Sequence, residues 1–125
     1  MRPDPETLRA LALRCEAGDE TLSDDVWRTL GYTRWTGDLW NFPDTLGPIR
    51  LGDLCCSIDA QAALGVRVLT VAWFDTNDGS GWREECRAHA YVASDLTSSA
   101  FAPTEPLARL AAILRCLAAR AEAGE

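Results

Sequence analysis

An apolar stripe near the end of the chain limits the possible folds more than any other feature of the sequence. Between Thr104 and Gly124 the apolar positions recur at intervals of three and four residues, at Leu107, Leu110, Ala111, Leu114, Leu117 and Ala118. This spacing predicts a helix with one buried face, with Thr104 as its cap and Pro106 in its first turn. Such a helix needs an apolar surface to cover it, and its small alanines allow a close approach to a sheet.

The residues before this helix can form such a sheet. The run 66–74 is dense in β-branched and aromatic residues, and residues 82–92 alternate between two faces. We therefore predict two antiparallel strands joined by the polar turn 75–81. Cys86 falls on the mostly apolar face of the second strand, whereas His89 shares the other face with arginines.

Three further helices are predicted nearer the N-terminus. The first begins after Asp4 and ends at Gly18, and the second is capped by Ser23 and ends at Gly31. The third is capped by Ser57, and its apolar stripe consists of Ile58, Ala62 and Ala63. Between the second and third helices, residues 32–42 are rich in aromatic side chains and predict a loop or short edge strands.

The order of these elements predicts the fold class. Helix, helix, aromatic loop, helix, hairpin and helix (αα-α-ββ-α) favour an α+β fold, a layered sandwich in which helices pack on a small, hairpin-based antiparallel β-sheet. The 125 residues fit one core, so we expect a single globular domain over residues 1–125.

Charge and hydropathy limit the classes of partner. The formal net charge is −7, and all twelve basic residues are arginine. An acidic surface disfavours direct nucleic-acid binding, which depends on cations that neutralise phosphates, but it suits a basic protein partner. No signal peptide and no apolar run of membrane-spanning length is recognisable, so we expect a cytoplasmic protein with no membrane association.

The five cysteines raise the question of thiol or metal chemistry. They are odd in number and match no disulfide or zinc spacing, so buried, reduced thiols are expected. An enzyme that uses a thiol or a metal would draw on Cys55, Cys56, Cys86 and His89. The adjacent cysteines and the single histidine form no standard catalytic or metal-binding pattern, and we predict no catalytic residue, no metal and no cofactor.

Two groups of residues are candidates for contact with a partner. Asp19, Glu20, Asp24 and Asp25 belong to an acidic stretch, residues 16–25, that contains no basic side chain. Its alternative explanation is a solvated face with acids at a helix N-terminus. The aromatic candidates are Tyr32, Trp35 and Trp40, because Tyr and Trp are enriched at interfaces, although they also cover cores beside irregular segments.

Three segments resemble a known family. TLSDDVWRTLGY, CSIDAQAAL before a strand pair, and APTEPLARLAAILRCLAA are similar in type and order to small phage and prophage proteins of the phage ABA-sandwich type. The resemblance covers most of the chain and supports the layered fold. The sequence departs from the pattern in its longer hairpin and at Cys55 and Cys56, where a Tyr-Thr pair is more familiar. The family motifs are structural, so they transfer no catalytic residue.

Together these features predict a non-enzymatic, phage- or prophage-encoded protein that binds another macromolecule. The most specific form of this hypothesis is an inhibitor of a host defence complex, similar to an anti-CRISPR protein, that contacts a host protein or nucleoprotein complex. An accessory phage protein with a role in assembly or gene regulation is the alternative, beside the thiol- or metal-dependent enzyme.

Overall fold

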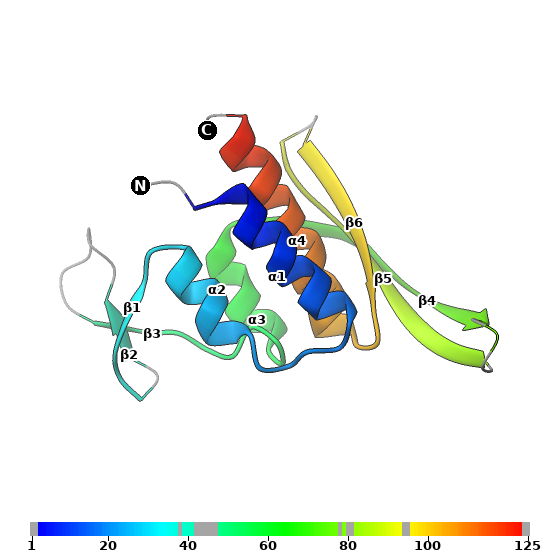
Figure 1. The fold of residues 1–125 in the computed structure, drawn as a ribbon, viewed down its shortest axis with the longest axis horizontal. Coiled ribbons are helices and arrows are strands. Elements are labelled where there is room, and N and C mark those ends of the chain that lie inside the picture. Colours follow the sequence, from blue (N-terminus) through cyan, green and yellow to red (C-terminus); the bar gives the residue numbers. More distant parts are fainter. Residues whose placement is uncertain are drawn as a thin grey trace.

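The chain folds as an α+β protein in which a helix packs on an antiparallel sheet and a second helix covers the first. The computed structural model describes residues 3–37, 39–41, 48–77, 79, 82–93 and 96–123. Figure 1 shows the main sheet on one side of the molecule, the long helices beside it, and a smaller sheet at the opposite end. The fold class is the one predicted from the sequence.

The main sheet consists of β4 (Arg67–Asn77), β5 (Trp82–Ala93) and β6 (Leu96–Ala102), in the order β4-β5-β6 with all neighbours antiparallel. The register pairs Val71 with Ala88 and Ala88 with Ala100, and all three lie on the face toward the helices. The opposite face carries Arg87, whose guanidinium lies 5.6 Å from the ring centroid of Phe101.

The helix α4 (Glu105–Glu122) lies at the centre of the molecule. Thr104 caps it by accepting a hydrogen bond from the backbone N–H of Leu107 at 3.4 Å, as predicted. The sheet packs on one side of α4 and α1 (Pro5–Glu16) on the other. Its buried surface is therefore wider than the predicted stripe and also includes Ala108, Ala112, Ile113 and Cys116.

The first two helices agree closely with their predicted bounds, with one difference at a cap. In α1, the side chain of Asp4 accepts a hydrogen bond from the Glu6 N–H, and the chain leaves the helix through Gly18 at φ +91°. Helix α2 (Ser23–Thr29) begins at Ser23, which is not its side-chain cap. The Ser23 hydroxyl instead accepts the Leu54 N–H at 2.9 Å and ties α2 to the following loop.

The aromatic segment forms part of a second sheet. Its strands are β1 (Thr33–Thr36), β2 (Leu39–Asn41) and β3 (Ile49–Arg50), in the order β1-β2-β3. Residue 38 and residues 42–47 lie outside the described part of the chain. The small sheet packs beside α2, and Trp40 of β2 joins the main core.

The third helix differs from its prediction. Helix α3 (Ile58–Gln61) is short and continues as a single 3-10 turn, Ala62–Leu64, and Ser57 caps it as predicted. Its expected apolar stripe is wrong, because Ile58 and Ala62 are exposed and Gln61 is the buried residue. The Gln61 amide Nε2 donates to the carbonyls of Leu54 and Pro106 at 2.8 and 2.7 Å, which compensates the burial of this nitrogen.

Candidate functional site

A polar cleft between α2, the small sheet and the loop 51–53 is the candidate site. Its volume is about 290 Å³. It is lined by Glu20, Thr21, Ser23, Asp24, Trp27, Arg34, Gly37, Trp40, Leu51, Gly52 and Asp53. Three segments that are distant in sequence thus form one cleft, and three of its residues, Glu20, Asp24 and Trp40, are predicted contact residues.

The floor of the cleft is fixed by two tryptophans. The indole Nε1–H of Trp27 donates to the carbonyl oxygen of Gly52 at 3.1 Å and so holds the loop against α2. A Cβ at Gly52 would lie 2.9 Å from the Cβ of Ala60, so only glycine fits here without a shift. Trp40 is 1% exposed, and the Arg34 guanidinium lies 4.7 Å from its ring centroid.

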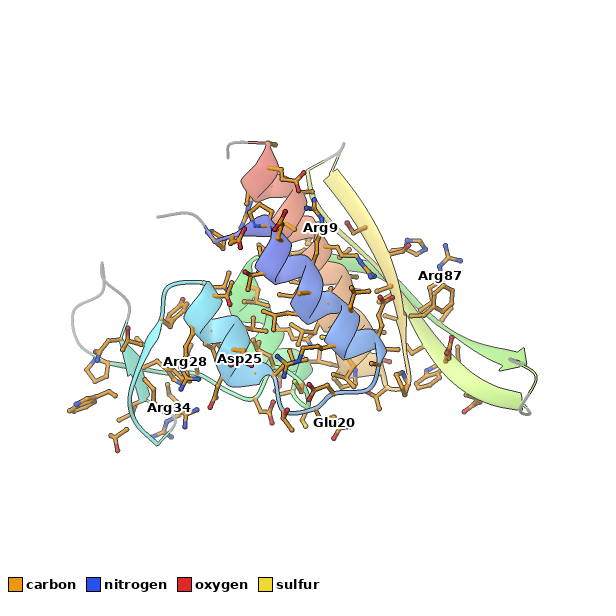
Figure 2. All side chains as sticks on the ribbon, viewed as in Figure 1. Arg9, Glu20, Asp25, Arg28, Arg34 and Arg87 are labelled. Atoms are coloured by element: carbon orange, nitrogen blue, oxygen red, sulfur yellow. The ribbon has the colours of Figure 1, made fainter. Side chains whose placement is uncertain are left out.

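Arginines neutralise most of the acidic stretch. Asp24 pairs with Arg34 across the cleft. Figure 2 shows Arg28 and Arg34 near each other between α2 and the small sheet. The sequence could not indicate this pair, since Arg34 lies beyond the acidic stretch and reaches Asp24 only when β1 packs beside α2.

One arginine of α1 binds Asp19 and Asp25 on the side of α2 that faces away from the cleft. The Arg14 Nε donates to Asp19 at 2.9 Å, and its Nη1 donates to Asp25 at 3.0 Å. Asp19 also accepts the hydroxyl and the N–H of Thr21, at 2.6 and 2.8 Å. Hydrogen bonds from Thr21, together with Arg14, lower the pKa of Asp19 to about 2.

Glu20 and Asp53 are the cleft carboxylates that have no basic partner among the described residues. Glu20 is exposed at the rim, where Figure 2 labels it. Asp53 accepts the Cys55 N–H at 2.9 Å, which fixes one of its oxygens and leaves the negative charge uncompensated. Sequence reasoning missed Asp53 because it is separated from the acidic stretch by the whole small sheet.

The three candidate aromatics lie in different environments. Tyr32 packs edge-on against Trp27 with ring centroids 5.3 Å apart and is partly buried against the core. Trp40 is a core residue beneath Arg34. Trp35 of β1 is 60% exposed and has a large free surface. Of the three, Trp35 is the one whose position suits contact with a partner.

The cysteine pair precedes α3 and divides into one buried and one exposed thiol. Cys55 lies in the core, and burial raises the pKa of its thiol to about 11. Cys56 is exposed, and the nearby Asp53 carboxylate raises the pKa of its thiol. Both thiols are thus protonated at neutral pH, which is opposite to the lowered pKa of a nucleophilic cysteine.

The other residues of the thiol or metal hypothesis lie elsewhere. Cys86 is buried on the face of β5 that packs on α4, and His89, three positions along the same strand, lies on the opposite face. In the described part of the chain, no three His, Cys, Asp or Glu residues are grouped closely enough to hold a metal ion.

Comparison with protein-family models, with curated proteins and with solved structures finds no match to this chain. The resemblance to phage ABA-sandwich proteins therefore stays a prediction. Among the described residues no helix combines the length and the apolar character needed to span a membrane.

Proposed function

We propose that this protein is a non-enzymatic binding module that takes a basic side chain of a partner protein into the cleft beside α2. The observation that carries the proposal is that Glu20 and Asp53 line one cleft with no basic partner among the described residues. Carboxylates in such a position gain most from a guanidinium or ammonium group, which forms charge-assisted hydrogen bonds with them.

The surroundings of the two acids favour a protein ligand. Trp35, on the strand next to the cleft, offers an exposed indole of the kind that contributes strongly to protein interfaces. The net charge of −7 favours encounter with a basic surface and disfavours approach to nucleic acid. The partner class is thus a protein that exposes arginine or lysine.

A partner that exposes arginine or lysine also indicates a biological role. Host proteins that handle nucleic acid expose basic surfaces, and an acidic protein that covers such a surface blocks it. We therefore propose an inhibitor of a host defence complex that acts in the bacterial cytoplasm, with an accessory role in phage assembly or gene regulation as the alternative. Both roles use the same cleft.

The test compares binding by the wild type and by a variant with Glu20→Gln and Asp53→Asn. These changes remove charge and keep the side-chain shape, and the new amide at the second position retains an oxygen that can accept the Cys55 N–H. A matched control, Glu84→Gln, removes an exposed acid from β5 of the main sheet. Partners are captured from a bacterial host lysate at low and at physiological salt and identified by mass spectrometry.

The double variant should lose a specific basic partner that the wild type and the control retain, with binding weakened about ten-fold or more. Capture by the wild type should also weaken as salt rises. In a direct assay, an arginine-rich peptide is added to the protein and followed by nuclear magnetic resonance. The peptide should shift the backbone amide signals of the residues that line the cleft. Equal binding by the double variant and the wild type would contradict the proposal.

A further inference from the structure

The outer face of the main sheet is open. Helix α4 packs on the inner face, and Figure 1 shows the described helices on that side of the sheet. The register assigns Arg67, Arg87, His89 and Phe101 to the outer face, because Ala88, between two of them on β5, is buried beneath α4. In the part of the chain that the structure describes, this face therefore meets solvent and not another layer of the fold.

Two arginines on this face differ from the paired arginines of the fold. Arg14 and Arg34 bind carboxylates, whereas neither Arg67 nor Arg87 forms an ion pair with a described residue. The buried Nε of Arg87 also has no hydrogen-bond acceptor among the described residues. Among the described strand residues, the register places one acid on this face, Glu85, and it has an interaction of its own within the chain. Both cations are thus uncompensated in a protein whose net charge is −7.

An exposed aromatic ring lies beside one of these cations. Phe101 is the register partner of Arg87 across β5 and β6 and is 39% exposed, and the Arg87 guanidinium lies 5.6 Å from its ring centroid. Figure 2 shows Arg87 extending from the sheet on the side away from the helices. The ring thus holds the guanidinium beside an apolar surface. Together they offer contacts for a carboxylate and for an apolar side chain of the same segment.

The second cation lies farther along the same face. Arg67 is the register partner of Tyr91, which is four residues beyond Arg87 on β5, about 13 Å along a strand. His89 lies between these two levels and adds a ring that donates or accepts a hydrogen bond. This spacing matches an extended chain in which acidic residues recur at every fourth position.

We propose that the outer face of the main sheet binds an acidic, extended segment of a partner protein. Carboxylates of the segment pair with Arg87 and Arg67, because the planar fork of a guanidinium matches a carboxylate. An apolar side chain next to the first carboxylate covers the ring of Phe101. The site is separate from the cleft beside α2, whose carboxylates suit basic groups.

A protein segment suits this face better than a nucleic acid does. Affinity for a nucleic acid grows with the number of phosphates that cations neutralise, and the described side chains of this face supply two arginines. The net charge of −7 also repels a long polyanion. A short acidic segment needs only a few ionic contacts, and it gains the apolar contact with Phe101 as well.

Fluorescence anisotropy with defined peptides tests the proposal. The probe is a labelled peptide of three Glu-Leu-Ser-Gly repeats, and its control peptide carries Gln in place of Glu. The wild type is compared with the double variant Arg67→Met and Arg87→Met, and with Phe101→Thr, whose backbone N–H can still bind Glu16. The matched control is Arg120→Met on α4, an arginine that likewise forms no ion pair with a described residue.

The acidic peptide should bind the wild type and Arg120→Met, and its affinity should fall as the salt concentration rises. The arginine double variant should bind it about ten-fold more weakly or worse, and Phe101→Thr should also weaken it. The uncharged peptide should bind all forms weakly. If Phe101→Thr does not fold by circular dichroism, the arginine variants decide.

Thermal unfolding separates a binding role of Arg87 from a structural one. Arg87→Met keeps an unbranched apolar stem on the sheet and removes a buried nitrogen that has no acceptor among the described residues. The variant should therefore keep the Tm of the wild type or raise it, while it loses affinity for the acidic peptide. A clear fall in Tm with unchanged peptide binding would assign Arg87 to the fold and would overturn the proposal.

Three other results overturn the proposal. The first is a wild type that does not bind the acidic peptide even at millimolar concentration and low salt. The second is a labelled single-stranded oligonucleotide that binds more tightly than the peptide and is lost in the same arginine variant, which would assign the face to nucleic acid. The third is self-association in sedimentation velocity that the arginine variant abolishes, which would assign the face to a second copy.

The cleft variant with Glu20→Gln and Asp53→Asn separates this proposal from the proposed function. It should retain the acidic peptide, because the peptide binds the outer face of the main sheet and not the cleft. Failure of the acidic peptide to bind leaves the test of the cleft with basic partners unaffected. Equal loss of the acidic peptide in the cleft variant and in the arginine variant would contradict a site on the sheet.

Discussion

Leu114→Ala should destabilise the protein strongly, because Leu114 is fully buried in the helix that both the sheet and α1 cover. The change removes three carbon atoms of the side chain from the core, about 2.4 kcal/mol at about 0.8 kcal/mol for each carbon group. A cavity term adds to this loss, since a helix packed on two sides has little room to collapse, and the total is about 3 to 4 kcal/mol.

The matched control is Leu13→Ala, which makes the same chemical change on α1 at a side chain that is 62% exposed. Leu13→Ala should alter the free energy of unfolding by less than about 0.5 kcal/mol, and Arg120→Ala near the end of α4 should also cost little. Urea denaturation measures the free energy of unfolding of all three variants. In thermal unfolding, Leu114→Ala should lower the Tm by roughly 10 °C or more. Equal, small losses for the two leucine variants would refute the central position of α4.

Two further predictions follow from the shifted pKa values. Asp19 has a pKa of about 2, below the ordinary value near 4, so its bonds to Thr21 and Arg14 stabilise the fold above about pH 4 and are lost as the pH falls toward 2. The stability of Asp19→Asn should therefore vary less over this range in acid titrations followed by circular dichroism, and an unchanged profile would contradict the assignment. For the thiols, alkylation followed by mass spectrometry should label Cys56 in the folded protein and all five cysteines after unfolding. Because the Asp53 carboxylate raises the pKa of the Cys56 thiol, its labelling at neutral pH should be slower than that of a free cysteine and should accelerate as the pH rises. Rapid labelling of Cys55 in the folded state, or a Tm that falls with a chelator or a reductant, would contradict a fold held by packing alone.

The sequence predicted the elements whose signals are local. The caps at Asp4, Ser57 and Thr104 and the alternation of Cys86 with its neighbours all depend on residues close in the chain, and the structure confirms them. The strand β6 was missed, since its small and polar residues carry little strand preference. It forms because β5 offers an edge and because Ala100 and Ala102 fit beneath α4.

The candidate site was harder to predict because its decisive contacts join distant segments. The acidic stretch contains no basic residue, but arginines from α1 and β1 form ion pairs with its carboxylates. The uncompensated negative charge of the stretch is therefore smaller than its sequence indicates. Similarly, no local pattern indicates the buried position of Gln61, because the two carbonyls that its amide binds belong to distant segments. Charge patterning identifies candidate acids, and tertiary structure determines which of them stay uncompensated.

Arginine is well suited to this neutralisation. One Arg14 guanidinium binds Asp19 and Asp25 through different nitrogens, and one Arg34 guanidinium pairs with Asp24 while it covers the ring of Trp40. The planar, multidentate guanidinium permits such double contacts, whereas a lysine ammonium concentrates its charge at a single point. In a chain whose basic residues are all arginine, a few cations thus fix the α1–α2–β1 region and leave Glu20 and Asp53 as the uncompensated carboxylates of the cleft, as far as the structure describes the chain.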